Sequence, residues 1–208
     1  LIEKLKKMPG VLSAEPNYIA RVAVVPNDPY FPPSSGAWGQ SFFNLWGLAN
    51  IDASSAWDLT LGSGQIVAVI DTGVDYNHPE LTGRVINGPD YINNDLDSKD
   101  DYGHGTHVAG TIAAQINNGL GIVGVAPGVT IMAIKVLNRS GSGPFTAIAN
   151  GIRYAADHGA NIINLSLGGT ASALSNVMND AINYAHDMGV VVVVAAGNNS
   201  KDVDGSNF

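Results

Sequence analysis

From Gln65 onward, short runs of β-branched residues alternate along the chain with longer amphipathic stretches. This alternation is typical of βαβ units, in which helices connect parallel strands. The expected strands are 66–70, 130–136, 161–167 and 190–196, and the expected helices are 105–116, 146–158 and 173–187. Because the strands are continuously apolar, we expect both faces of the sheet to be covered. The pattern predicts an α/β fold, a three-layer sandwich with a mostly parallel central sheet.

The first part of the chain does not follow this pattern. Residues 1–21 predict the end of a helix, a break at Pro9-Gly10 and a short strand at 11–15. Several prolines between 22 and 38 favour a surface linker over a regular element.

Composition limits the classes of function. A chain of 208 residues with 45% hydrophobic and 13% charged residues predicts one globular domain. No apolar run approaches the roughly 18 residues that a membrane span needs, so we expect a soluble protein. There is no cysteine. The net charge is −8, with +2 on residues 1–21 and −10 on the rest, which argues against nucleic acid as a partner.

One strand is predicted to end at a carboxylate, Asp71, which Thr72 and Gly73 follow. Polar residues at the carboxyl ends of parallel strands commonly form binding and catalytic sites. The simpler alternative is an aspartate that caps a turn. Aspartic proteases also use Asp-Thr-Gly, but they need two such carboxylates, and no second copy occurs in the sequence. A homodimer could still provide one.

A histidine flanked by glycines, His104, opens a predicted helix after an acidic loop. Such a histidine can act as an exposed base. His107 lies three residues further on the same helix face, which is compatible with zinc binding. The glutamate that a metallopeptidase helix would carry between them is absent.

Four segments occur in the order typical of subtilases. They are Asp71-Thr72-Gly73, the run from His104 to Gly110, the run from Asn164 to Gly169, and Ala195-Ala196-Gly197-Asn198. The chain therefore resembles the front portion of a subtilisin-like serine endopeptidase. The resemblance implies that Asp71 orients His104, that His104 is the general base, and that Asn198 donates to the oxyanion. It also implies that His107 is a buried structural residue.

The same resemblance implies an extended peptide substrate held between two edges. Ser166, Leu167 and Gly168 match one edge, and Gly141, Ser142 and Gly143 match the other. Phe145 matches an aromatic wall of a more distant pocket. For Ser142 and its glycines, a flexible surface turn is the simpler alternative.

Calcium is the expected cofactor, with a structural role, and no organic cofactor is expected. The carboxylates of Asp90, Asp95 and Asp97 lie in a dense acidic loop, which favours a hard cation or, alternatively, is simply solvated. The resemblance implies a second, thermitase-like site. Its ligands would be the side chains of Asp28, Glu80 and Asn118 and the carbonyls of Ile116, Leu120 and Ile122.

The segment Gly-Thr-Ser-Met-Ala, which carries the nucleophile in subtilases, does not occur in these residues. We therefore expect a catalytic domain at 23–208 that is incomplete at its C-terminus and inactive as it stands. Residues 1–22 are expected to be the end of an inhibitory propeptide, cleaved within 18–27. The family implies a secreted monomer that cleaves polypeptides without a membrane partner. A peptide-binding pseudoenzyme is the alternative.

Overall fold

The computed structural model describes residues 1–16, 24–31, 36–169 and 176–198. Five parallel strands form one sheet in the order β2-β3-β1-β4-β5. The strands are β1 (Ile66–Asp71), β2 (Val85–Asp90), β3 (Thr130–Lys135), β4 (Ile162–Leu165) and β5 (Val191–Val194). The helices are α1 (Ile2–Leu5), α2 (Trp46–Asn50), α3 (Ala53–Trp57), α4 (His104–Ala113), α5 (Phe145–Asp157) and α6 (Asn176–Asp187). The predicted α/β fold is confirmed.

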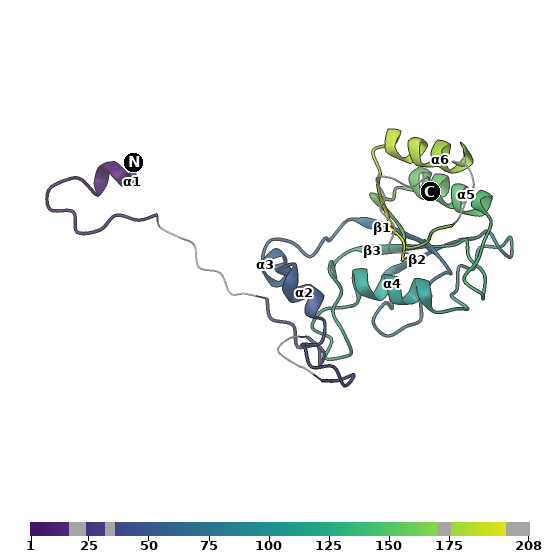
Figure 1. Ribbon diagram of the computed structural model, residues 1–208, viewed down its shortest axis with the longest axis horizontal. Coiled ribbons are helices and arrows are strands. Elements are labelled where there is room, and N and C mark those ends of the chain that lie inside the picture. Colours follow the sequence, from purple (N-terminus) through teal and green to yellow (C-terminus); the bar gives the residue numbers. More distant parts are fainter. Residues whose placement is uncertain (17–23, 32–35, 170–175, 199–208) are drawn as a thin grey trace.

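Helices cover the sheet on both faces, as Figure 1 shows, with α5 and α6 on one side and α4 on the other. Alternate residues of a strand point to opposite faces, and the core divides accordingly. Ile70 of β1 and Ile134 of β3 pack with α5, whereas Val69 and Ala133 pack with Ala109 of α4. These three layers match the sandwich expected from the sequence.

Glycines end the two long helices that follow β3 and β4. Gly159 and Gly189 adopt φ values of 83° and 82°, which a residue with a Cβ adopts only with strain. The next residue, Ala160 or Val190, donates its N–H back to the carbonyl of Ala155 or Ala185, five positions earlier. Each glycine therefore reverses the direction of the chain, and the next strand begins within three residues of it.

One prediction about local structure was wrong, and one strand was missed. Residues 11–16 contain no strand, although one was expected at 11–15. β2 was not expected, because its sequence includes Asn87, Gly88 and Pro89, which normally indicate a turn. A Cβ at Gly88 would overlap the carbonyl of Ala133, so the glycine allows β2 to approach β3 closely. Residues 173–175 of the expected last helix lie outside the described residues.

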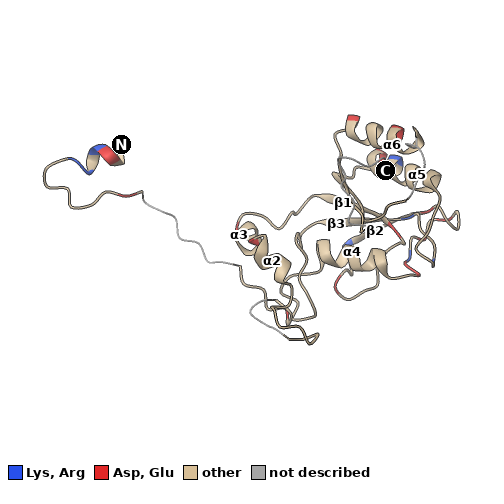
Figure 2. Ribbon diagram, in the orientation of Figure 1, with Lys and Arg blue, Asp and Glu red and all other residues tan. Residues whose placement is uncertain are grey.

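Charged residues lie mainly on loops and helices, as Figure 2 shows. No helix within the described ranges is long and apolar enough to cross a membrane.

Candidate active site

Asp71 ends the central strand, β1, and its side chain is completely buried. Its Oδ1 accepts a hydrogen bond from the Thr72 N–H at 2.7 Å. Both carboxylate oxygens lie close to Nδ1 of His104, at 2.8 and 2.9 Å. The contact between the strand-end carboxylate and the helix-start imidazole, on which the sequence interpretation depended, is present.

His104 is held at the first turn of α4 by the backbone around it. Gly103 before it has a φ of 104°, and Gly105 after it donates its N–H to Thr72 Oγ1 at 2.9 Å. A Cβ at position 105 would overlap the carbonyl oxygen of Gly73, so only glycine permits this approach of the helix to β1. Glycine is thus favoured at position 103 by the positive φ and at position 105 by the close approach of α4 to Gly73.

The loop before His104 is ordered by the carboxylate of Asp100. One oxygen accepts from the N–H groups of Tyr102 and Gly103, and the other from the N–H and hydroxyl of Thr106. Partial burial raises the pKa of Asp100, but these bonds to the ionised form lower it, and the net result is a pKa below the ordinary value. Asp100 was not among the candidate residues, although an acidic residue before a helix is a signal for capping.

His107 does not take part in this site. It was expected to be buried in the helix, but its side chain is exposed. The buried face of α4 carries Gly105, Ala109 and Ala113, and position 107 lies off this face. Within the described ranges, no group of three or more His, Cys, Asp or Glu residues could hold a metal ion, so the pair His104 and His107 has no third ligand of this kind.

His104 lines a groove of about 330 Å³. All seven residues predicted to bind substrate line it, and they are Gly141, Ser142, Gly143, Phe145, Ser166, Leu167 and Gly168. The sequence analysis missed five further lining residues, which are Thr72, Tyr102, Leu137, Ile148 and Gly169. Leu137 and Ile148 have the pattern of core residues, and nothing in the sequence separates them from the core. Thr72 and Gly169, in contrast, lie within the motifs already quoted.

Asn198 follows β5 and is exposed. It is not one of the residues that line this groove. Like Asp71, it follows the carboxyl end of a strand, and the carboxyl ends of parallel strands meet at the same edge of a sheet.

A second hollow, of about 630 Å³, is larger but has no ionisable side chain in its wall. Its lining is mainly apolar and includes Trp38, Phe42, Phe43 and Trp46. Because acid–base chemistry needs titratable groups, the smaller groove at His104 is the candidate active site.

Two residues expected at the thermitase-like metal site, Asp28 and Glu80, both contact the loop after α4. Asp28 and Glu80 are both buried, with 4% and 6% exposure. Glu80 accepts from the Asn118 side-chain amide at 2.8 Å and from the Ile122 N–H at 3.0 Å. Asp28 Oδ2 accepts from the Asn117 N–H, whereas its Oδ1 is buried without a hydrogen-bond partner. A buried carboxylate oxygen without a partner fits a site for a cation.

The acidic loop does not form a comparable site from Asp90, Asp95 and Asp97. Asp90 accepts from the N–H groups of Ile92 and Asn93, and Asp95 accepts from that of Asp97. Asp97 accepts from Tyr76 and Lys99. Each carboxylate therefore accepts a hydrogen bond from a residue close to it in sequence. The three do not form a group that could hold a metal ion.

Comparison with known proteins agrees with this geometry. The model of the subtilase family (peptidase S8) matches residues 62–207. The chain belongs to the subtilase family. Among curated subtilases and related proteinases, it is 50% identical over 173 residues to thermitase from Thermoactinomyces vulgaris, covering 83% of this chain and 58% of thermitase. It is 48% identical over 200 residues to a thermophilic serine proteinase from Bacillus sp. (strain AK1), covering 96% of this chain and 47% of that protein.

The fold is also that of solved subtilases. Proteases from Pseudoalteromonas arctica PAMC 21717 match with a TM-score of 0.69 and 35% identity, over 83% of this chain and 59% of theirs. A cold-adapted subtilisin-like serine proteinase matches with a TM-score of 0.60 and 40% identity, over 67% of this chain and 48% of its own. The chain thus spans about half the length of the curated relatives it matches.

Proposed function

We propose that the protein containing these residues is a serine endopeptidase in which Asp71 and His104 are two members of the catalytic triad. The observation that carries the proposal is the contact of the buried Asp71 carboxylate with Nδ1 of His104, which lines a groove together with both expected peptide-binding edges. Family membership supports the same chemistry.

The geometry supports a definite division of roles. A hydrogen bond from Nδ1–H to Asp71 leaves Nε2 as the free base. His104 would take the proton of a serine hydroxyl as its oxygen attacks the carbonyl carbon of the peptide. Asn198 would donate to the oxyanion that forms. His104 would then return the proton to the leaving amine, and water would hydrolyse the acyl-enzyme by the same steps.

The serine itself is proposed to lie outside these 208 residues, because the sequence contains no Gly-Thr-Ser-Met-Ala segment. The 208-residue chain alone would then have no triad turnover.

The groove supports an extended polypeptide as substrate. Gly141, Ser142 and Gly143, which belong to one expected edge, line the groove together with Ser166, Leu167 and Gly168 of the other. Such edges can pair with a peptide as an added strand. Phe145, with Leu137 and Ile148 nearby in the lining, would favour an apolar side chain.

The test uses the complete protein. Wild type should hydrolyse peptides and react with a serine-directed phosphonate, and His104→Ala should lose both activities. His107→Ala is the matched control, because His107 is an exposed histidine of the same helix and should keep both. Turnover without phosphonate labelling, or full turnover of His104→Ala, would contradict the proposal. Peptide binding with neither labelling nor turnover would instead indicate a pseudoenzyme.

A dimeric aspartic protease has no support from the geometry. Asp71 is completely buried, and its oxygens are engaged by Thr72 and His104. A second aspartate would have to approach that carboxylate within hydrogen-bond distance to share a proton.

We also propose a structural calcium ion held by Asp28, Glu80 and Asn118, with the carbonyls of Ile116, Leu120 and Ile122. Support comes from the buried Oδ1 of Asp28, which has no hydrogen-bond partner, and from the bonds of Asp28 and Glu80 to the adjacent residues Asn117 and Asn118. Calcium prefers such oxygen donors. Its role would be to hold the segment around Asp28 against the loop after α4.

Two further proposals rest on sequence resemblance. Residues 1–22 are proposed to be the end of an inhibitory propeptide, with cleavage within 18–27, and the mature enzyme is proposed to act outside the cell as a monomer. The basic 1–21 segment, at +2, contrasts with the acidic remainder, at −10. N-terminal sequencing of the mature enzyme from culture medium should find a start within this window, and a start at or before residue 10 would contradict the propeptide.

A further inference from the structure

Lys135 is a buried cation at the end of β3, with 1% of its surface exposed. Its Cα is in register with Asp71 of β1. Residues Val69 and Ala133, two positions earlier on each strand, pack on the α4 side of the sheet. Because side chains alternate along strands, Lys135 and Asp71 point to this same side.

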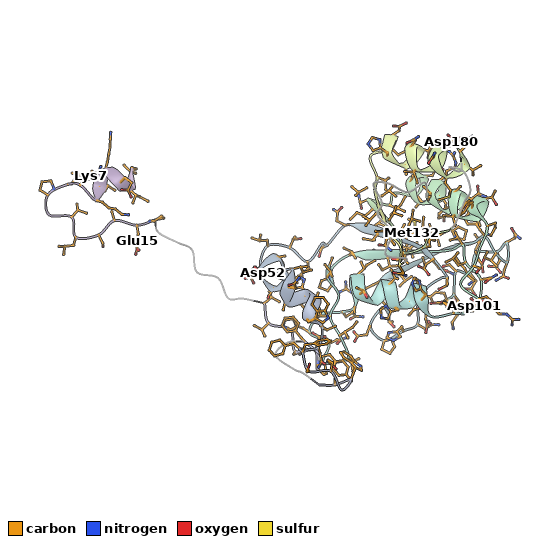
Figure 3. All side chains as sticks on the ribbon, viewed as in Figure 1. Lys7, Glu15, Asp52, Asp101, Met132 and Asp180 are labelled. Atoms are coloured by element: carbon orange, nitrogen blue, oxygen red, sulfur yellow. The ribbon has the colours of Figure 1, made fainter. Side chains whose placement is uncertain are left out.

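The ammonium of Lys135 uses all three of its N–H donors. It donates to the carbonyl of Thr72 at 2.7 Å, to the carbonyl of Leu137 at 2.8 Å and to Oδ1 of Asp101 at 2.5 Å. Thr72 directly follows Asp71, Leu137 lines the groove, and Asp101 lies three residues before His104. Figure 3 labels Asp101 on the loop beside α4. One group therefore joins three segments of the candidate active site.

Thr72 transmits this constraint to both members of the pair. While its carbonyl accepts from Lys135, its N–H donates to Asp71 Oδ1 and its hydroxyl accepts from the N–H of Gly105. The position of Thr72 thus determines the position of the Asp71 carboxylate through one bond. Through the other bond it determines the position of the first turn of α4, which carries His104.

Stability alone is a poor explanation for this arrangement. Burying an ammonium costs several kcal/mol, and an apolar side chain of similar length in a well-packed site is often neutral or stabilising. The single carboxylate partner, Asp101, is itself 47% exposed, so its attraction is weakened by solvent. What an apolar side chain would lack is the connection between the three segments.

We propose that Lys135 is a positioning residue, whose ammonium fixes the Asp71–His104 pair relative to the groove wall through Thr72, Asp101 and Leu137. The inference rests on the proposed peptidase function. Nothing in it requires Lys135 to contact the substrate.

The test compares Lys135→Met with Lys99→Met in the complete protein. The same substitution at exposed Lys99 is the matched control and should leave turnover unchanged. With kcat expressed per folded molecule, Lys135→Met should lower kcat by about 10- to 100-fold while KM changes by less than about 3-fold. If Lys135→Met keeps the wild-type kcat and only loses thermal stability, the role is structural and the inference is overturned.

A spectroscopic readout separates this inference from the proposed function. The downfield proton NMR signal of His104 Nδ1–H, assigned by its loss in His104→Ala, should weaken or shift in Lys135→Met and stay unchanged in Lys99→Met. This signal reports the geometry of the pair whether or not the protein hydrolyses peptides. An unchanged signal in Lys135→Met would overturn the inference, whereas a wild type without activity would overturn only the proposed function.

If Lys135→Met does not fold, Asp101→Asn replaces it. This change removes the charge of a half-exposed residue and keeps an acceptor for Lys135. It should produce a smaller fall in kcat and a shift of the same proton signal. Wild-type values for both would overturn the inference.

Discussion

The Asp71 carboxylate is completely buried, whereas the imidazole that it contacts, that of His104, keeps 43% of its surface exposed. The buried partner therefore fixes one ring nitrogen, Nδ1, and the exposed part of the ring remains available in the groove that His104 lines. A base that must receive and return a proton needs this combination of a fixed orientation and an open side.

Asp71→Asn should nearly abolish turnover. Its amide can be oriented to donate to Nδ1, which would place the imidazole proton on Nε2 and remove the base. We expect kcat to fall by about 10⁴-fold, measured with a peptide substrate in the complete protein. Asp52→Asn is the control, because Asp52 is exposed and asparagine tolerates its φ of 54°. A loss below about tenfold would argue against Asp71 as the orienting residue.

Asn198→Ala should remove a donor to the oxyanion. Since that bond strengthens in the transition state, kcat should fall by about 10²- to 10³-fold and KM should change little. Steady-state kinetics on a small peptide measure both values. If KM rises while kcat is kept, Asn198 contributes to substrate binding and not to the oxyanion.

Gly143→Ala should damage the groove wall. A Cβ at this position would overlap the carbonyl oxygen of Val136, and backbone cannot move aside cheaply. We expect KM for extended peptides to rise by about 10-fold or more, since a shift of about 1 Å in groups that position the substrate can cost about 100-fold. Gly47→Ala on α2 is the control, because its Cβ would meet no atom within 4 Å. Equal KM values for the two variants would contradict this role for Gly143.

The motifs predicted the residues of the site better than the hydrophobic periodicity predicted the strands. Asp71 and His104 could be paired because each belongs to a sequence segment with a fixed place in the family, and the structure puts them in contact. β2 could not be predicted, because its Gly88 serves a close approach to β3 that only the fold reveals. Patterns along one chain describe local preferences, and a contact between strands is not local.

The exposure of the His107 and Lys135 side chains also does not follow from the sequence. The family resemblance implied that His107 is buried, yet the buried face of α4 runs through Gly105, Ala109 and Ala113. Lys135, for which the sequence analysis made no prediction, is buried, although a lysine at a strand end is normally expected to reach solvent. In both cases the side chain's environment depends on the neighbouring element, which the sequence does not specify.

Acid should destabilise the loop before His104, through Asp100. Partial burial raises the pKa of Asp100, but its four hydrogen bonds lower it below the ordinary value. A lowered folded-state pKa stabilises the protein fully above the unfolded value of about 4, and this stability is lost as pH falls through the folded pKa. Thermal melts of the complete protein should therefore show Tm decreasing from pH 5 to pH 3.

Asp100→Asn should show less of this acid dependence and should be less stable at pH 7 by about 1–2 kcal/mol, because its bonds lose a charged acceptor. Asp180→Asn, at an exposed position of α6, should parallel wild type. If the melts of Asp100→Asn fall with acid as steeply as those of wild type, Asp100 is not the group responsible.

Removal of calcium should lower the thermal stability of the complete protein. Asp28 Oδ1 is buried without a hydrogen-bond partner, so loss of a cation would leave an uncompensated buried charge. At a free calcium concentration of about 1,000 times Kd, bound metal contributes about 4 kcal/mol. A chelator should therefore lower Tm, and added calcium should restore it.

Two variants locate the ion. Asp28→Asn weakens one proposed site, and its Tm should no longer respond to the chelator. Asp97→Asn changes the acidic loop, where the Asp97 carboxylate already accepts from the Lys99 N–H and the Tyr76 hydroxyl, and its Tm should respond as wild type does. If Asp97→Asn loses the response and Asp28→Asn keeps it, the ion binds in the acidic loop, and the assignment to Asp28 and Glu80 is wrong.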